Sequence, residues 1–531
     1  MRLKPGAKVF LAIVVLVLIG AGAYRLGWLN PVVKVVAPER KPAGKVEQGD
    51  FAFAKTAPSG GEVPKSGAKL DRPIRVAIVL WGGYAGGIME NGGFTPNRQC
   101  AFYKDHGIEV ELVQIDDFAE SRNAFRAGGD KGGVDMMWGT VDAYALEYQS
   151  LSELRPVTIM QYDWSRGGDA IAVASGINSA GDLRGKKISV AQATPSHFFL
   201  LYMLAQANLS TDAVTMVFTN SAIEAAQVFK AGKVDACVSW SPDVYIAAKD
   251  RPGAHILAST REATHLIADI FIARGDFVER YPTETVNFVS GWLEGVDAVH
   301  ADPDRAAQLM QKSFTGITLE DSEGMLADVK LPDAAENREF FVLQGQPVIS
   351  YDELYSAASR IWKKVGLVTE LSRPEATRNV SFLDQATQEA KGTVVASAEE
   401  FKFVPPTQET KKQAPIVTKR MTVYFATGSA VLDDNAKSVL EQAAELAQTF
   451  GSTYIRVSGN TDSKGTRQLN MELSKKRAQS VVDHLVAKYH FPRDKFIVVG
   501  NGPDKPVAGN DSEEGRAKNR RTDFEVIPQE Q

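Results

Sequence analysis

Asp462 and Arg477 are the two residues whose types and positions most clearly indicate binding chemistry. Asp462 follows a run that predicts a strand ending at Asn460 and Thr461, and Arg477 lies on the next predicted helix. A carboxylate takes an ammonium group, and the planar fork of a guanidinium binds a carboxylate through two hydrogen bonds. The pair therefore suits a small zwitterion. The alternative is an ordinary exposed salt bridge between a turn aspartate and a helix arginine, which contributes little stability.

The stretch from Ser458 to Ala478, S-G-N-T-D-S-K-G-T-R-Q-L-N-M-E-L-S-K-K-R-A, resembles the OmpA-like domain family. Its T-D and N-x-x-L-S-x-x-R-A signatures are both present, and N-R-R follows at 519–521. The resemblance covers about residues 421–527 and implies binding of the diaminopimelate of peptidoglycan. Asn460 stands where many relatives have histidine, which leaves the implied clamp unchanged. The residues assigned to the site, called the clamp residues below, are Thr461, Asp462, Asn470, Arg477 and Arg520.

Four predicted turns in the first two thirds of the chain share a second pattern, in which an apolar strand stops, a small or polar turn follows, and a helix begins. They are W-G-G-Y at 81–84, W-G-T at 138–140, A-T-P-S at 193–196 and W-S-P-D at 240–243. In an open α/β sheet a ligand binds outside the carboxyl ends of the strands, near helix N-termini and aromatic side chains. The predicted solute-binding residues are Trp81, Tyr84, Trp138, Thr140, Asp169, Thr194, Ser196, Trp240 and Asp243.

Four longer segments of the same region carry a family resemblance. They are V-D-M-M-W-G-T, G-G-D-A-I, D-L-R-G-K-K-I-S-V and A-G-K-V-D-A-C-V-S-W-S-P-D, and they resemble the periplasmic solute-binding proteins of the nitrate/sulfonate/taurine family (NMT1/THI5-like, type II). The resemblance covers about residues 73–385. It implies two lobes that close around a solute and are joined by two crossings, near Tyr162–Ile171 and Ala268–Ala273.

The charges near the four turns indicate the class of solute. The resemblance implies that Asp169, Asp243 and Asp269 fall at ligand-facing or hinge positions, and no turn contains arginine or lysine. An anionic solute would leave these carboxylates unpaired, whereas aromatic faces and carboxylates attract cations. Helix N-termini near Thr140 and Ser196 favour anions. We therefore expect an amine-bearing or zwitterionic solute. Alternatively, Asp169 and Asp269 are hinge residues bonded to backbone N–H groups, and the tryptophans are core.

Composition restricts the classes of function. The chain has 531 residues, 44% of them hydrophobic and 24% charged, as in ordinary globular proteins of several domains. A net charge of −5 gives no basic footprint, so we expect no nucleic-acid partner. Cys100 and Cys237 form no C-x-x-C motif, and the histidines show no ligand spacing, so no metal or cofactor is expected. The two cysteines fall in different predicted lobes, which favours buried thiols over a disulfide bond.

The amino terminus predicts export. Arg2, Lys4 and Lys8 precede an uncharged run, Val9–Tyr24, and positive charge before an apolar run keeps that end cytoplasmic. An uncleaved anchor would extend to Leu29. The anchor is favoured because the uncharged run is long for the core of a signal peptide. A cleaved signal peptide ending near residue 23 is the alternative. Either way, we expect the rest of the chain on the periplasmic side of the inner membrane of a Gram-negative bacterium, anchored by a single pass or released after cleavage.

These features divide the chain into five segments. The predicted fold class is α/β: an N-terminal membrane helix, a two-lobed type II periplasmic-binding-protein fold, and a small α+β OmpA-like domain whose first strand is Val423–Phe425. The predicted boundaries are 1–30 for the anchor or signal segment, 31–71 for a flexible linker, 72–390 for the solute-binding domain, 391–419 for a second linker, and 420–528 for the OmpA-like domain.

Three classes of function follow from this organisation. The first is a solute-binding protein tethered to peptidoglycan, which collects a small molecule for an ABC-type permease or a sensor. The second is a structural envelope tether between inner membrane and peptidoglycan, whose solute domain no longer serves transport. The third, an enzyme, is not expected, because the sequence contains neither a G-x-S-x-G elbow nor an H-E-x-x-H motif.

Overall fold

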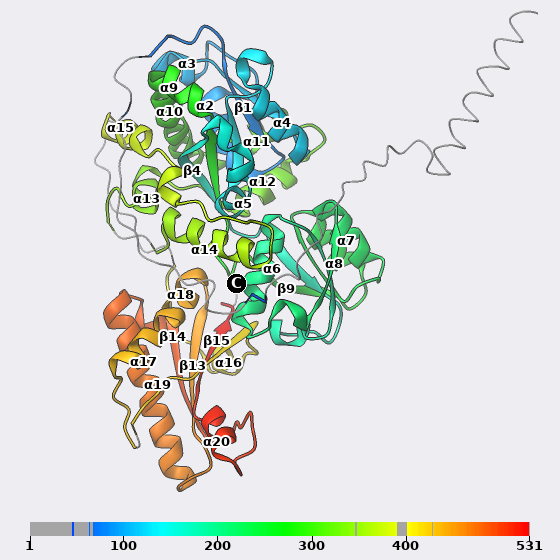
Figure 1. Cartoon of the computed structure of the whole chain (residues 1–531). Coiled ribbons are helices and arrows are strands. Elements are labelled where there is room, and N and C mark those ends of the chain that lie inside the picture. Colours follow the sequence, from blue (N-terminus) through cyan, green and yellow to red (C-terminus); the bar gives the residue numbers. More distant parts are fainter. Residues whose placement is uncertain are drawn as a thin grey trace, which may run out of the picture. The chain divides into compact units, whose positions relative to one another are not determined.

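The computed structural model describes residues 45–46, 63, 67–345, 348–389, 401–426 and 428–529 (Figure 1). Among these residues, no helix combines the length and the apolar composition needed to cross a membrane. The predicted anchor, residues 1–30, and most of the predicted linker, residues 31–71, lie outside the described residues.

The first lobe of the large domain is built on a six-stranded mixed sheet with the order β11-β4-β10-β3-β1-β2. Strand β1 runs parallel to β2 and β3, whereas β10 is antiparallel to β3 and β4. Most residues of the central strands are apolar and buried, the pattern of a sheet covered by helices on both faces. The strands are β1 (Ile74–Ile78), β2 (Val110–Gln114), β3 (Met136–Thr140), β4 (Val157–Ser165), β10 (Ala268–Ala273) and β11 (Val329–Lys330).

The second lobe has a five-stranded sheet with the order β7-β6-β8-β5-β9. Strand β6 is parallel to β7 and β8, and β5 is antiparallel to β8 and β9. The strands are β5 (Asp169–Val173), β6 (Lys187–Ala191), β7 (Thr215–Thr219), β8 (Ala236–Trp240) and β9 (His255–Ser259).

The chain passes between the lobes twice, at residues 166–168 and at residues 260–267. The second crossing therefore precedes the predicted Ala268–Ala273, which forms strand β10. The Thr260 hydroxyl joins the crossings, because it accepts hydrogen bonds from the backbone N–H groups of Gly167 (2.9 Å) and Asp169 (3.3 Å). It also lies 2.9 Å from the hydroxyl oxygen of Ser165.

Helices cover both sheets, and several begin at the side-chain caps that their sequences predict. Thr194, for example, accepts a hydrogen bond from the His197 N–H at the start of α6. The first-lobe helices are α2 (Ala85–Asn91), α3 (Ala101–His106), α4 (Phe118–Ala127), α5 (Val141–Leu151), α9 (Gly275–Arg280), α10 (Pro282–Ala301), α11 (Pro303–Ser313), α12 (Leu319–Ala327), α13 (Ala334–Phe340), α14 (Tyr351–Lys364) and α15 (Ser381–Glu389). The second-lobe helices are α6 (Pro195–Gln206), α7 (Ala222–Lys230) and α8 (Asp243–Asp250).

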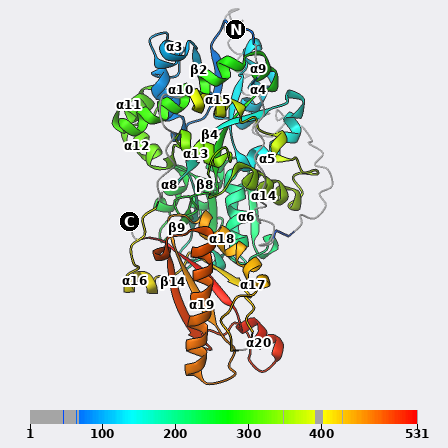
Figure 2. The same cartoon turned by 90° about the vertical axis from the view of Figure 1, so that its left-hand side faces the viewer.

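The C-terminal domain, yellow to red in Figure 1, has a four-stranded sheet with the order β12-β15-β13-β14. Helix α19 packs along β13 and β14 (Figure 2), because Gly459 and Gly500 leave no Cβ to separate them. A Cβ on Gly459 would lie 2.2 Å from the Ser474 carbonyl oxygen. The strands are β12 (Val417–Met421), β13 (Tyr454–Asn460), β14 (Phe496–Gly502) and β15 (Thr522–Ile527). The helices are α16 (Gln408–Lys412), α17 (Asp434–Val439), α18 (Glu441–Thr449), α19 (Arg467–Tyr489) and α20 (Glu513–Asn519).

The first strand of this domain corrects the prediction of a strand at Val423–Phe425. The strand is β12, which pairs with β15 from Val417 opposite Val526 to Met421 opposite Thr522. Residues 401–419, predicted as part of a linker, thus contain α16 and most of β12. Cys100 and Cys237 are free and buried, the first beside α3 in one lobe and the second on β8 in the other.

Candidate functional site

Asp462 lies in the turn that follows β13, close to Arg520 at the C-terminal end of α20. The Lys464 N–H donates to Asp462 Oδ1 at 2.9 Å, and Arg520 Nη1 lies 2.7 Å from Asp462 Oδ2. Asn470, on the first turns of α19, closes the loop by donating to the Lys464 carbonyl oxygen at 2.9 Å. These bonds hold a buried carboxylate in one orientation. The neighbouring Thr461 hydroxyl donates to the Asp462 carbonyl oxygen at 2.9 Å.

Arg477 lies farther along α19 and is half-buried. Its Nε donates to the Ser429 carbonyl oxygen at 2.9 Å, and its Nη2 donates to the Ala426 carbonyl oxygen at 3.3 Å. The guanidinium carbon stands 4.9 Å from the centre of the Phe425 ring, within cation–π range. Burial lowers the pKa of Arg477, and the neighbouring charge of Asp462 opposes that shift. The guanidinium is thus fixed by backbone carbonyls and an aromatic face.

The clamp residues all line one pocket of about 800 Å³, called the wall pocket below. Among the described ion pairs, Asp462 is joined to Arg520 and not to Arg477, so the simple salt bridge considered as the alternative is absent from that set. Phe425, Lys464 and Glu513 also line the pocket, and the sequence analysis did not assign them to it. Glu513 lies 2.7 Å from Arg520 Nη2 and shares that arginine with Asp462. The T-D signature gave no signal for Glu513, which comes from a separate helix.

The four predicted turns of the large domain converge where the two lobes meet. Trp138 of the first lobe and Trp240 of the second both contact the ring of Phe118, at centroid distances of 4.8 Å and 5.8 Å. The Trp81 indole N–H donates to Asp163 Oδ2 at 3.0 Å. On the other side, Arg122 stacks over the Trp138 ring at 4.5 Å. The three tryptophans therefore lie at the junction of the lobes.

Tyr84 corrects the predicted lining of the cleft. Gly82–Tyr84 forms a 3-10 turn that directs the tyrosine ring inward, where it is fully buried. There it packs against Tyr162 and Phe271, and its hydroxyl oxygen accepts a hydrogen bond from Tyr162 at 3.1 Å. Tyr84 is thus part of the first-lobe core.

The polar residues of the remaining turns have local roles as well. Thr140 and Thr194 cap α5 and α6 by accepting from backbone N–H groups at 3.3 Å. Ser196 donates to Asp169 Oδ1 at 2.5 Å, which links two predicted solute-binding residues directly. Asp243 is half-buried in the first turn of α8, and burial raises its pKa.

Four buried aspartates gather at this junction, and together they are called the carboxylate cluster: Asp142, Asp163, Asp169 and Asp269. They come from α5, β4, β5 and β10, and Asp163 and Asp269 are opposite one another in the antiparallel β4–β10 pair. None of the ion pairs in the described part of the chain includes any of the four. Asp169 and Asp269 were predicted from the sequence. Asp142 and Asp163 were not, because they lie in the first turn of a helix and in a strand that carry no separate motif.

Burial shifts the proton equilibria of the carboxylate cluster upward. Burial, with the charges of Asp169 and Asp269, raises the pKa of Asp142 to about 8, and neither of its carboxylate oxygens has a hydrogen-bond partner among the described residues. Burial raises the pKa of Asp169 to about 6, although Ser196 donates to it. Burial also raises the pKa values of Asp163 and Asp269. The cluster is therefore a region where a bound cation or protons are strongly favoured.

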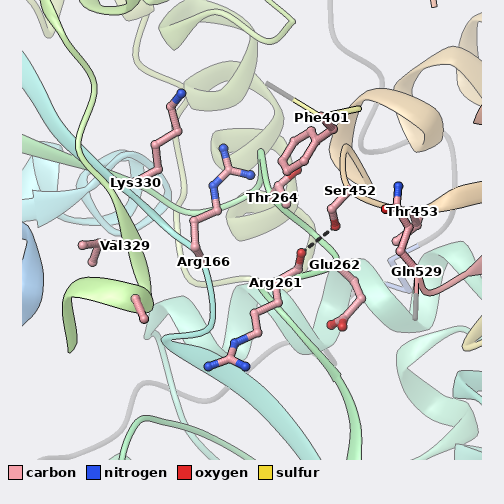
Figure 3. A pocket seen from close by; sticks show the side chains of 11 residues that line it. Arg166, Arg261, Glu262, Thr264, Val329, Lys330, Phe401, Ser452, Thr453 and Gln529 are labelled. Atoms are coloured by element: carbon pink, nitrogen blue, oxygen red, sulfur yellow. Dashed lines mark hydrogen bonds between the residues drawn. The ribbon is translucent and has the colours of Figure 1, made fainter. Parts of the chain in front are cut away.

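A separate pocket of about 610 Å³ contains Arg166, Arg261 and Lys330 (Figure 3). Arg261 pairs with Asp328 at 2.8 Å, and Lys330 pairs with Glu336. The dashed line in Figure 3 marks the hydrogen bond that the Ser452 hydroxyl donates to the Arg261 carbonyl oxygen at 2.7 Å. Arg261 and Lys330 are thus already paired with acidic side chains.

Comparison with known proteins agrees with this division into two binding regions. Residues 93–306 match the NMT1/THI5 like family, and residues 424–520 match the OmpA family. The chain thus carries an NMT1/THI5-like domain followed by an OmpA family domain, and both resemblances noted in the sequence are confirmed.

Two curated relatives match through the C-terminal part of the chain. Outer membrane protein A of Bordetella avium is 37% identical over 128 residues, which are 23% of this chain and 66% of that protein. The peptidoglycan-binding protein ArfA of Mycobacterium bovis is 34% identical over 104 residues, 20% of this chain and 32% of that protein. The chain therefore spans less than two thirds of either relative.

The chain is also similar to a solved structure of a periplasmic protein. The periplasmic aliphatic sulphonate binding protein SsuA of Escherichia coli is 17% identical, with a TM-score of 0.46, over 58% of this chain and 97% of that chain.

Proposed function

We propose that the chain is a cell-envelope solute-binding protein tethered to peptidoglycan through its C-terminal domain. Asp462 would accept hydrogen bonds from the ammonium group of diaminopimelate, and Arg477 would bind the carboxylate of the same amino-acid centre. Arg477 Nη1 makes no hydrogen bond with the described residues, so it is the nitrogen available to a ligand carboxylate. Arg520 would hold Asp462 in place and share its charge.

A single observation carries this proposal. Asp462 and Arg477 line the same pocket but are held by different protein partners, so opposite charges face one cavity without neutralising one another directly. A rigid, separated pair of opposite charges is complementary to a zwitterion and to little else of that size.

Co-sedimentation with purified sacculi tests the wall-binding proposal. The full chain is expected to pellet with sacculi, and free diaminopimelate should release it. 1,5-Diaminopentane is the matched control, because it has the same two ammonium groups at the same separation but neither carboxylate. Release by 1,5-diaminopentane and diaminopimelate at the same concentrations would show that the pocket does not recognise a zwitterionic centre.

We propose further that the large domain binds an amine-bearing or zwitterionic solute at the junction of its lobes. The carboxylate cluster supports a cation there, because four buried acids without a basic partner otherwise carry a large desolvation cost. Trp81, Trp138 and Trp240 would supply aromatic surface, with Thr140, Thr194, Ser196 and Asp243 as polar contacts at the helix starts.

The solute proposal is tested by thermal unfolding of the full chain with a panel of primary amines, quaternary amines, amino acids, aminosulfonates and simple sulfonates. A rise in melting temperature confined to compounds with a positive group is expected, and native mass spectrometry would identify a co-purified solute. A rise only with simple sulfonates would contradict the cation proposal. No rise with any compound would favour the second candidate, a structural tether between the inner membrane and peptidoglycan.

The proposed location is the periplasm of a Gram-negative bacterium, with the chain anchored in the inner membrane by its N-terminal segment. Tethering to the wall would keep the large domain near an ABC-type permease or a sensor that receives the solute. In this proposal the chain binds and delivers, and catalyses no reaction. A pull-down with crosslinked envelope membranes would identify the permease or the sensor.

A further inference from the structure

Three helices of the first lobe, α2, α3 and α10, meet at a point separate from the carboxylate cluster. Two glycines of α10 allow this close approach. A Cβ on Gly291 would lie 3.0 Å from the His106 ring, and a Cβ on Gly295 would lie 3.0 Å from the Glu90 Cβ. Any larger residue at either position would push α2 or α3 away from α10. The sequence thus packs His106 and Glu90 against the helix that carries Glu294.

Glu90, His106 and Glu294 each direct one ligand atom to this meeting point. The three atoms lie within 4.8 Å of one another, and His106 Nε2 is 2.9 Å from Glu294 Oε2. Tetrahedral bonds of about 2.1 Å to a zinc ion would separate ligand atoms by about 3.4 Å. The 2.9 Å distance is shorter than that separation and 4.8 Å is the upper bound of the others, so side-chain rotations must adjust the three atoms when an ion binds. Asn287 fixes the end of α3 by donating to the His106 carbonyl oxygen at 2.8 Å.

Glu90 gives an independent reason to expect a cation. Its side chain is 6% exposed, and its Oε1 has no hydrogen-bond partner in the described part of the chain. The charges that act on it are those of Glu294 and Asp105, both acidic. A carboxylate buried beside other acids is costly unless a positive charge is present. A protonated His106 would give one such charge, but it already pairs with Glu294.

We propose that Glu90, His106 and Glu294 form a binding site for a divalent transition-metal ion, with Zn²⁺ as its ligand. One imidazole nitrogen and two carboxylate oxygens are a donor set that zinc accepts, whereas Ca²⁺ and Mg²⁺ prefer oxygen ligands alone. The Glu294 side chain is 53% exposed, so water can reach the site and complete a tetrahedron. The ion would join α2, α3 and α10 and stabilise the first lobe independently of any solute.

Zinc binding to the full chain, purified without a polyhistidine tag, tests this proposal. Isothermal titration with zinc chloride is expected to show one site per chain that excess Mg²⁺ or Ca²⁺ does not block. Because the ion binds the folded protein, saturating zinc should raise the melting temperature by a few degrees, and EDTA should reverse the rise. The variants Glu90→Gln and His106→Gln should each weaken zinc binding at least tenfold.

His300→Gln is the matched control, because His300 is an exposed histidine in the last turn of the same helix α10. It should bind zinc as the wild type does. In EDTA, Glu90→Gln should melt at or above the wild-type temperature, since it removes a buried charge, and this measurement separates lost ligation from lost folding. Absence of saturable zinc uptake by the wild type, or wild-type uptake by both Glu90→Gln and His106→Gln, would overturn the proposal.

Discussion

The wall pocket and the carboxylate cluster both use aspartates with little exposure, but their surroundings differ. In the wall pocket, Asp462 has a backbone N–H donor and a guanidinium within 3.0 Å, so its charge is already compensated before a ligand arrives. In the carboxylate cluster, Asp142 has no ion-pair partner among the described residues, and the charged groups nearest to it are the carboxylates of Asp169 and Asp269. The first site is preorganised for binding at little cost, whereas the second is destabilising until protons or a cation enter it.

The largest expected effect concerns Asp142 in the carboxylate cluster, the site whose charges are not compensated. The pKa of Asp142 lies above its ordinary value of 3.8, at about 8, so the folded chain keeps this proton longer than the unfolded chain. The resulting stability is complete below about pH 4 and is lost as the pH rises to about 8. The variant Asp142→Asn cannot ionise, and it should remove about 2–5 kcal/mol of this pH dependence.

Urea unfolding of the full chain at pH 5 and pH 8.5 measures this difference. Asp304→Asn is the control, because Asp304 is an exposed acid in the first turn of α11. It should leave the pH dependence of the wild type unchanged. Parallel stability profiles for the wild type and Asp142→Asn would mean that Asp142 gains its charge at no cost, and the contrast between the two sites would be lost.

The next largest effect concerns Asp462 in the wall pocket, where the charge of the carboxylate is compensated. Asp462→Asn keeps the shape of the side chain but removes its charge, so it should weaken sacculus binding by about 1.5–3 kcal/mol, or roughly 10–100-fold. The measurement is co-sedimentation with sacculi over a range of protein concentrations. Asp504→Asn, whose parent residue pairs with Arg467 outside the pocket, should bind as the wild type does. Equal losses in both variants would point to a general charge effect.

A smaller effect is expected from Arg477→Lys. Lysine keeps the positive charge but cannot make the two fixed bonds to the Ser429 and Ala426 carbonyls and still present a nitrogen to the pocket. Sacculus affinity should fall by about 1–2 kcal/mol. Arg467→Lys, on the same helix, provides the comparison. If Arg477→Lys binds sacculi as tightly as the wild type, the pocket recognises a positive charge and does not require the planar guanidinium.

The smallest effect concerns the one acid of the carboxylate cluster that has a short hydroxyl donor. Ser196→Ala removes the 2.5 Å hydrogen bond to Asp169, so the pKa of Asp169 should rise further above about 6. The loss, about 1 kcal/mol, should appear at pH 8, where Asp169 is ionised, and diminish at pH 5. Ser239→Ala removes a bond to the Ala222 carbonyl oxygen, and its cost should be the same at both pH values. Urea unfolding at the two values distinguishes these outcomes.

Local patterns predicted the elements that end in recognisable turns. The W-G-T pattern predicted the junction of β3 and the start of α5, but its three residues form the end of the strand and not a turn after it. Thr140, its last residue, caps α5, and capping is a short-range effect. The T-D and N-x-x-L-S-x-x-R-A spacing likewise brought Asp462, Asn470 and Arg477 to one pocket. In these cases the residues that decide the structure are close together in the chain.

Long-range packing explains where the predictions from the sequence were wrong or incomplete. Strand β12 was missed because V-T-K-R-M contains two basic residues, and Lys419 is buried only because its ammonium group reaches the Gln442 carbonyl oxygen at 2.9 Å. Tyr84 was assigned to the cleft, but a core formed by Tyr162 and Phe271 takes its ring. Asp163 has no motif, and its role depends on Asp269, which β10 brings opposite it from a distant part of the chain.

The Thr260 hydroxyl, which bonds both crossings at once, has a mechanical consequence for the large domain. Because these hydrogen bonds tie the two connections together, sliding or twisting one against the other would break them. Relative motion of the lobes is therefore least costly where it leaves this contact intact.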